Sequence, residues 1–285
     1  MYKFEKQQYL EYVKRETDVV FVFSECWKQH LIQDFGWNQS KLKVLRHGSG
    51  FKMIEKDQAR QQLHLQSDDF IITNLNRNTY RKMWDVCIES FLLFLKQQDC
   101  NPKIKLMINC ALKSPSGFDL LELISIYCKQ LELDKETVVN KHILLLPEAG
   151  KLSDAGVNLI HCASDVGLNT CCGEGFGLCN LEGACLGVPQ IVSKVGALAD
   201  IFADFPSMLI EPVVKIQATE LHDVHWGQLE IIRASDVASQ LELMFKHPEQ
   251  ARILGALAQH KLRVKYNWDA ILNEFVDEFE AIQSS

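Results

Sequence analysis

The sequence has no hydrophobic run that approaches the ~18 residues needed to cross a membrane, and no dense tract of lysine and arginine. The first absence argues against a membrane-spanning helix. The second, together with a net charge of −7, argues against nucleic acid or an anionic membrane as the main partner. Residues 1–15 are polar and charged, so no secretory leader is predicted. We therefore expect a soluble protein of the cytoplasm, and peripheral association with a membrane stays open.

Metal-binding spacings are also missing. The sequence has ten cysteines but no C-x-x-C pair. Four of them, Cys171, Cys172, Cys179 and Cys185, gather in one stretch without a pair of histidines nearby, whereas structural zinc sites need such ligands at close spacing. Neither D-x-D nor G-x-x-x-x-G-K-[ST] occurs, so a bound divalent metal is not implied. We predict free, mostly buried thiols, with no metal and no cofactor.

What the chain does contain is a regular alternation of strands and helices. Its 285 residues, 47% of them hydrophobic, suffice for one large domain or for a full domain with part of a second. Alternating βα units predict an α/β fold with a Rossmann-like, doubly wound parallel sheet covered by helices on both faces. The predicted strands are 70–74, 103–109, 142–146 (closed by Pro147), 165–169, 190–192 and an edge strand at 207–210. The predicted helices are 57–64, 83–97, 118–131, 153–162, 178–185, one after Gly196, 237–245, 248–264 and 268–282. In the helix 178–185, Leu178, Leu181 and Cys185 are predicted to lie on the packed side.

The two ends of the chain are predicted to form a separate part. Residues 1–48 hold a β-rich run at 17–23, a helix that Ser24 caps and Gly36 ends, and a strand at 43–45. This single βαβ piece cannot bury both of its faces alone. The Gly/Ser turn at 47–50 is predicted to be a hinge, in which His47 has a structural role. The predicted boundaries are 1–48, 49–260 and a C-terminal helical segment 261–285, and the polar residues 211–234 are predicted to be irregular.

The stretch from Gly173 to Glu182 combines three glycines at alternate positions with two carboxylates. Glycine lets the backbone turn sharply and leaves room for a ligand, and the unpaired N–H groups of the following helix suit phosphate. Glu174 lies at the turn and Glu182 about one helical turn into the following helix, so both can line one crevice. A carboxylate pair that accepts hydrogen bonds from vicinal hydroxyls, beside a phosphate cradle, suits a nucleotide sugar.

A basic loop follows the predicted strand 70–74. Arg77 and Lys82 lie in it, at the carboxyl end of a strand, which is where ligands bind to parallel sheets. Two cations there could neutralise a diphosphate, with the arginine fork binding oxygens and the lysine acting as a point charge. Arg81 is an alternative to Lys82.

Taken together, these residues resemble the donor-nucleotide half of retaining glycosyltransferases of the GT-B fold, family four. Glu174 and Glu182 match the family's E-x7-E motif, and 174–178 match its EGFG loop. Residues 187–189, Gly-Val-Pro, match the turn after its helix. Arg77 and Lys82 fall where the family has its diphosphate-binding arginine and lysine. The resemblance runs from about residue 17 to residue 280.

The resemblance implies metal-independent transfer of a hexose from a nucleoside-diphosphate sugar to an acceptor hydroxyl, with retention of the anomeric configuration. Glu182 would bind the ribose hydroxyls and Glu174 would face the transferred sugar. Arg77 and Lys82 would stabilise the departing diphosphate. The donor-binding loop would be Gly175, Phe176, Gly177 and Leu178, the amides of the last three holding sugar hydroxyls and phosphate. GDP-mannose is the favoured donor, and the acceptor would be a carbohydrate, a lipid or a protein glycan.

The departure from the family's pattern leaves other interpretations open. Family members have a whole N-terminal Rossmann domain for the acceptor, and only its last βαβ piece, residues 1–48, is recognised here. The chain is then alternatively a non-catalytic nucleotide-sugar-binding subunit or fragment that needs a separate acceptor-domain chain, or forms a homo-oligomer. A sugar-nucleotide epimerase is a third hypothesis, and a dehydrogenase is disfavoured because no G-x-G-x-x-G follows the first strand. His161 is predicted to be a core or boundary residue.

Overall fold

The computed structural model describes residues 11–146, 152–218 and 227–283. The N-terminal residues 1–10 and Pro147, on which the sequence analysis made predictions, lie outside the described residues. The chain divides into two compact units, Met1–Gly48 with Tyr266–Ser285, and Ser49–Lys265. The boundaries predicted from the sequence fall after residues 48 and 260.

The smaller unit consists of a short βαβ piece and the last helix. Strands β1 (Val20–Val22) and β2 (Leu42–Val44) pair in parallel, and helix α2 (Glu25–Phe35) connects them. The Ser24 hydroxyl accepts a hydrogen bond from the Trp27 amide, and Gly36 ends the helix at φ 64°, so both predicted caps are confirmed. The last helix of the unit is α12 (Trp268–Gln283). The ring of its Phe275 lies next to the ring of Phe21, with 6.0 Å between the two centroids.

The larger unit contains a six-stranded parallel sheet in the order β5-β4-β3-β6-β7-β8. This is the strand order of a doubly wound Rossmann-like sheet, and its direction of winding reverses between β3 and β6. The predicted α/β fold class is confirmed. The strands are β3 (Phe70–Asn74), β4 (Ile104–Ile108), β5 (Ile143–Leu145), β6 (Val166–Asn169), β7 (Gln190–Ser193) and β8 (Leu209–Ile210).

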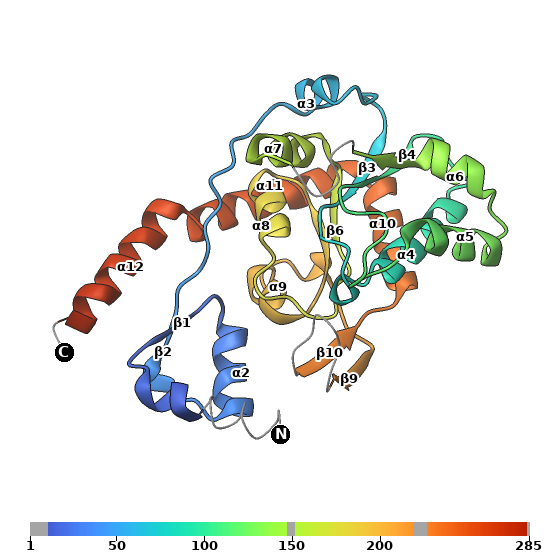
Figure 1. Ribbon diagram of the computed structural model, residues 1–285. Coiled ribbons are helices and arrows are strands. Elements are labelled where there is room, and N and C mark those ends of the chain that lie inside the picture. The colour runs from blue at the N-terminus through green and yellow to red at the C-terminus, as the bar shows by residue number, and fades with distance from the viewer. Residues whose placement is uncertain (1–10, 147–151, 219–226, 284–285) are drawn as a thin grey trace. The chain divides into compact units, whose positions relative to one another are not determined.

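Helices cover both faces of this sheet (Figure 1). Helices α4 (Trp84–Gln97), α5 (Leu120–Gln130) and α10 (Ala234–Lys246) lie on one face, and α7 (Asp154–Ala163), α8 (Leu178–Cys185) and α11 (Pro248–Lys265) on the other. Among the described residues, the remaining helices of this unit are α3 (Lys56–Gln62), α6 (Lys135–His142) and α9 (Gly196–Ile201), and its short 3₁₀ turns span Tyr80–Lys82 and Pro206–Met208. The 3₁₀ turn Gln39–Lys41 lies in the smaller unit.

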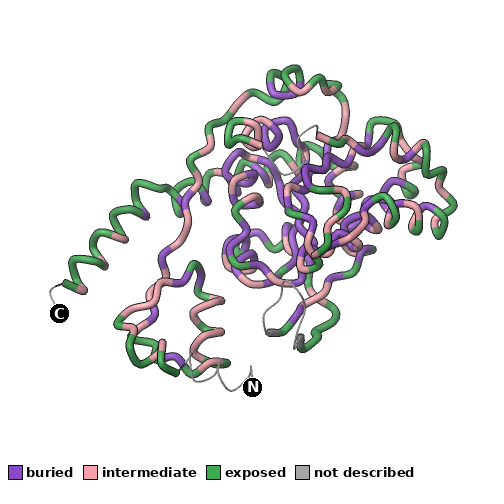
Figure 2. Tube along the Cα trace, viewed as in Figure 1, coloured by how far each residue is buried: buried purple, intermediate pink, exposed green. Residues whose placement is uncertain are grey.

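Alternation along each strand divides the apolar core into two layers. Ile72 packs with the α4 and α10 side chains, whereas its neighbour Ile71 packs with Ile160 of α7, because successive strand residues point to opposite faces. Five apolar residues at helical spacing in α4 are all fully buried, namely Trp84, Ile88, Phe91, Leu92 and Leu95. Buried positions concentrate around this sheet (Figure 2). No helix among the described residues is long and apolar enough to cross a membrane.

Two sequence predictions were wrong here. The prediction that residues 211–234 are irregular is wrong for two segments, because β9 (Val214–Ala218) and β10 (Gly227–Ile231) are strands that pair antiparallel. Residues 219–226, between them, lie outside the described residues. Val214 and Ile216 of β9 are exposed, whereas Leu229 of β10 is buried, so β9 lacks the usual contrast between a buried and a solvated face. His142 does not begin a strand but ends helix α6, which polar residues dominate and the Asp134 carboxylate caps.

The close approach of α11 to the turn after α8 gives a test of the fold. An added Cβ at Gly255 would lie 2.1 Å from the Gly187 carbonyl oxygen, so Gly255→Ala must displace backbone. Helix propensity would favour alanine by about 1 kcal/mol, but overpacking costs about 1–3 kcal/mol. We expect a net loss in the free energy of unfolding, measured by urea denaturation. Ala256→Gly, at an exposed position of the same helix, measures the propensity alone, and a stabilised Gly255→Ala protein would contradict the packing argument.

Candidate functional site

Two loops meet where the sheet changes its direction of winding. One follows β3 and the other follows β6, and these strands are neighbours. Backbone contacts join the loops: the Cys172 amide donates to the Arg81 carbonyl at 3.0 Å, and the Thr170 hydroxyl donates to the Met83 carbonyl at 2.9 Å. The backbone at Met83 has φ 47°, in the left-handed region, where the first loop turns into α4. The carboxyl ends of β3 and β6 therefore hold one continuous polar site.

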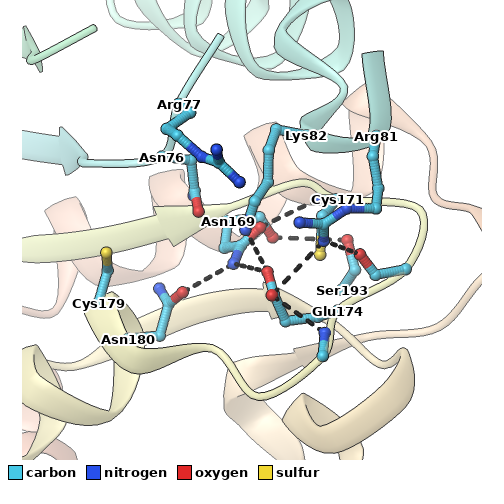
Figure 3. A network of polar contacts seen from close by, with 12 residues as sticks. Asn76, Arg77, Arg81, Lys82, Asn169, Cys171, Glu174, Cys179, Asn180 and Ser193 are labelled. Atoms are coloured by element: carbon cyan, nitrogen blue, oxygen red, sulfur yellow. Dashed lines mark hydrogen bonds and ion pairs between the residues drawn. The ribbon is translucent and has the colours of Figure 1, made fainter. Parts of the chain in front are cut away.

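A buried carboxylate, Glu174, lies at the centre of this site (Figure 3). Glu174 and Lys82 are each 7% exposed, and the Lys82 ammonium forms an ion pair with Oε2 of Glu174. The Arg81 guanidinium lies 3.5 Å from Oε1 and also donates to the Gly173 carbonyl. The Asn169 amide lies 3.5 Å from Oε2, and the Gly175 amide donates to Oε1 at 3.1 Å. We call Lys82, Arg81, Glu174 and Asn169 the carboxylate cluster.

The two cations decide the charge state of this carboxyl group. Burial on its own would raise the pKa of Glu174, but the charges of Lys82 and Arg81 and the hydrogen bonds from Lys82 and Asn169 outweigh it. The net result is a pKa below the ordinary value. Glu174 is therefore ionised at neutral pH despite its burial. Removing one partner from this buried ion pair costs free energy, because the other partner would then be a buried charge without compensation.

A chain of buried side-chain amides supports the cluster from the α8 side of the sheet. The Asn169 amide donates to the Asn180 side-chain oxygen at 2.8 Å, Asn180 donates to Gln190 at 2.9 Å, and Gln190 donates to the Val188 carbonyl at 2.9 Å. Space for Gln190 comes from Gly167, its partner across the β6–β7 register, where an added Cβ would lie 2.1 Å from the Gln190 oxygen. We call Asn169, Asn180 and Gln190 the amide chain.

The glycine loop has the sharp turn that the sequence predicts, at one of its three glycines. Gly177 has φ 95°, a conformation that favours glycine. An added Cβ at Gly173 or Gly175 would meet nothing within 4 Å, so the backbone there is open to a ligand. The loop is fixed from behind by Gly196, at which a Cβ would lie 2.2 Å from the Glu174 carbonyl oxygen.

The remaining predicted residues lie around the cluster. Arg77 is exposed, and its side chain extends towards Lys82 in Figure 3. Within the part of the chain that the structure describes, no hydrogen bond or ion pair is formed by its guanidinium. Glu182, on α8, has 20% of its side chain exposed, and its Oε2 lies 3.9 Å from Nε2 of His161. Leu178 does not join the packed side of α8 as predicted, since it is 41% exposed. Phe176 is 6% exposed.

Arg81 and the amide chain are the site residues that the sequence analysis did not select. Arg81 appeared there as an alternative to Lys82, and the structure places both cations on the same carboxylate. Asn169 ends strand β6 and Gln190 begins strand β7, both next to buried apolar residues, and this contrast is the signal that could have indicated them. A polar side chain buried in a sheet needs a partner.

The thiols near the loop are unreactive by environment. All ten cysteines are free. Burial raises the pKa of Cys171 to about 12 and that of Cys179 to about 11, so both are protonated at neutral pH. Among the described residues, no group of three or more His, Cys, Asp or Glu side chains is placed to hold a metal ion.

No family model matches the sequence, and no curated protein matches it. Several solved structures resemble this chain. The match with sucrose-phosphate synthase from Thermosynechococcus elongatus (TM-score 0.70, 20% identity) covers 96% of this chain and 61% of the synthase. The match with a glycosyltransferase from Rickettsia africae (TM-score 0.72, 15% identity) covers 97% of this chain and 67% of the glycosyltransferase. The match with HepE from Anabaena, solved in complex with UDP-glucose (TM-score 0.68, 17% identity), covers 96% of this chain and 68% of HepE. This chain therefore has the fold of GT-B glycosyltransferases and spans about two thirds of these neighbours.

The ionised state of Glu174 can be tested through stability. Glu174→Gln leaves Lys82 buried without its counter-charge, so we expect the free energy of unfolding to fall by about 3 kcal/mol at pH 7. Because the native pKa of Glu174 is depressed, its contribution is complete above the ordinary pKa and is lost as the pH falls through the native value. Urea unfolding at pH 7, 5 and 3.5 measures the free energy of unfolding of both proteins. We expect the difference in this free energy between wild type and variant to become smaller as the pH falls.

A matched control is Asp68→Asn, which removes an exposed carboxylate whose pKa is lowered by Lys103. Since this ion pair is in contact with solvent, its loss should change stability little. If the Glu174→Gln protein were as stable as wild type at pH 7, the stability of the carboxylate cluster would not depend on the negative charge of Glu174.

Proposed function

We propose that the chain binds a nucleoside-diphosphate sugar and transfers its hexose to an acceptor hydroxyl, with retention of the anomeric configuration and without a metal. The observation that carries this proposal is the carboxylate cluster itself: two cations surround one buried carboxylate at the switch point of a Rossmann-like sheet. Ligands bind to such sheets at that point. The open glycine loop beside the cluster leaves room for a sugar and a diphosphate.

The charge of the cluster suits a diphosphate. Lys82 and Arg81 against Glu174 leave one net positive charge, and the exposed Arg77 adds another. A diphosphate that enters can take the Lys82 ammonium as a partner, and Glu174 is then free to accept hydrogen bonds from the hydroxyls of the hexose. The pairing between Glu174 and Lys82 thus keeps the carboxylate ionised and both side chains in place until the donor binds.

The transfer step exchanges one bond at the anomeric carbon for another. The bond from this carbon to the diphosphate oxygen breaks as the acceptor oxygen bonds to the carbon from the same face. The acceptor proton passes to the departing diphosphate. Arg77 and Lys82 stabilise the negative charge that grows on that diphosphate, and Gly175, Phe176, Gly177 and Leu178 line the donor. Glu182 receives the ribose hydroxyls.

The donor's base and sugar are the finer part of the proposal. GDP-mannose is the donor that the resemblance favours, whereas HepE from Anabaena has been solved with UDP-glucose. The site described above binds the diphosphate, the hexose and the ribose, which these two donors share in outline. Both nucleotides therefore belong in the test.

A second candidate is a nucleotide-sugar-binding chain that does not transfer sugar by itself. The smaller unit favours it, because its sheet, in the part of the chain that the structure describes, has only the two strands β1 and β2. Donor binding without transfer, followed by transfer when an acceptor-domain chain is added, would support this candidate. Transfer by the chain alone would exclude it.

The donor site is tested by calorimetric titration with GDP-mannose, UDP-glucose and UDP-N-acetylglucosamine. Arg77→Ala is the sharpest variant, because its exposed guanidinium has no partner to lose in the described part of the free protein. A hydrogen bond to a charged group contributes about 1.5–3 kcal/mol, so we expect roughly ten- to hundred-fold weaker binding of the preferred donor with unchanged thermal stability.

Lys103→Met is the control, since this lysine is exposed in an ion pair with Asp68 near the start of β4. It should leave donor affinity unchanged. A folded wild-type protein that binds none of the three donors would overturn the proposal.

A further inference from the structure

One imidazole nitrogen in the larger unit is buried without a hydrogen bond. His161, in the last turn of α7, is 4% exposed, and its Nε2 has no hydrogen-bond partner among the described residues. Its neighbour is Oε2 of Glu182, at 3.9 Å. A buried nitrogen without a partner costs free energy, so such a group in a native structure needs an explanation.

The surroundings hold the His161 ring against α8. An added Cβ at Gly183 would lie 3.0 Å from Nδ1 of His161 and 2.8 Å from Nε2 of Gln190. The glycine therefore gives the space into which both side chains fit. The ring of Phe51 lies beside that of His161, tilted by 46° and with a centroid distance of 6.3 Å. His161 thus has a defined place beside two consecutive residues of α8, Glu182 and Gly183.

We propose that His161 is a positioning residue for Glu182. In the tautomer that carries the proton on Nε2, the imidazole N–H donates to Oε2 of the carboxylate, and a small rotation of the Glu182 side chain shortens 3.9 Å to a hydrogen bond. The other oxygen of Glu182 then faces the ligand. This inference rests on the proposed function, in which Glu182 receives the two ribose hydroxyls.

The benefit of such an arrangement is preorganisation. Glu182 is partly exposed at the surface of α8, and a free glutamate loses rotamer freedom when it binds a ligand. A hydrogen bond from a buried, immobile imidazole restricts the carboxylate before the nucleotide arrives. Selectivity for ribose over 2′-deoxyribose follows, because only a fixed carboxylate meets both hydroxyls at good geometry.

The experiment is a calorimetric comparison of UDP with 2′-deoxy-UDP and of GDP with 2′-deoxy-GDP. For wild type we expect the ribonucleotide of the preferred base to bind about ten-fold or more tightly than its 2′-deoxy form. Glu182→Gln and His161→Leu should each remove most of that preference. His161→Gln retains an N–H donor and should keep part of it. For both His161 variants, affinity for the 2′-deoxy nucleotide should change by less than about two-fold.

A purely structural histidine would behave differently, and His142→Leu serves as the control. His142 is equally buried and its Nδ1 lies 2.9 Å from the Ile104 carbonyl oxygen, among α6, β4 and β5. Its replacement should lower thermal stability without changing the preference for ribose. Each variant is checked for folding by circular dichroism.

The outcomes separate this inference from the proposed function. A ribose preference retained in His161→Leu but lost in Glu182→Gln overturns the role of His161. Equal binding of ribo- and 2′-deoxy nucleotides by wild type overturns the roles of both Glu182 and His161 and leaves the diphosphate site in place. Binding of neither UDP nor GDP by the folded wild type overturns the proposed function itself, and this inference with it.

Discussion

The site depends on one constraint, which is that nearby positive charges must compensate the negative charge of the buried Glu174. Lys82 and Arg81 provide that match from the loop after β3, and the amide chain restrains the carboxylate from the α8 side. Because the two loops follow neighbouring strands of a parallel sheet, the fold brings Lys82 next to Glu174, although the two residues are 92 positions apart in sequence. The winding of the sheet determines where such an arrangement can form.

Periodic patterns predicted the elements that bury one face or both. Strand β3 and helix α4 were predicted within a residue of their ends, because their apolar residues meet the core at the expected spacing. The antiparallel pair β9–β10 was missed because Val214 and Ile216 of β9 are exposed. The two strands are joined by backbone hydrogen bonds and by the ion pair of Lys215 with Glu230. Helix α6 was missed because few of its residues are buried.

The candidate site was predictable in its residue types and less so in its pairings. Glu174 and Lys82 were selected as separate binders of sugar and diphosphate, whereas in the structure they bind each other. A one-dimensional pattern cannot show which neighbouring basic residue of a 3₁₀ turn points inward, so Arg81 remained an alternative. The amide chain joins β6, α8 and β7, and no sequence periodicity records such contacts.

The glycines that accommodate Gln190 have a consequence for how this sequence can change. Gly167 and Gly183 each leave the volume that the Gln190 amide occupies, and Gly183 leaves room for His161 as well. An added Cβ at Gly167 would meet Gln190, whereas one at Gly183 would meet both Gln190 and His161. A larger residue at either glycine therefore needs these side chains to shift or to be smaller, and a smaller residue at 190 leaves Asn180 without this acceptor. Substitutions at the four positions are thus coupled, and in related chains we expect them to occur together.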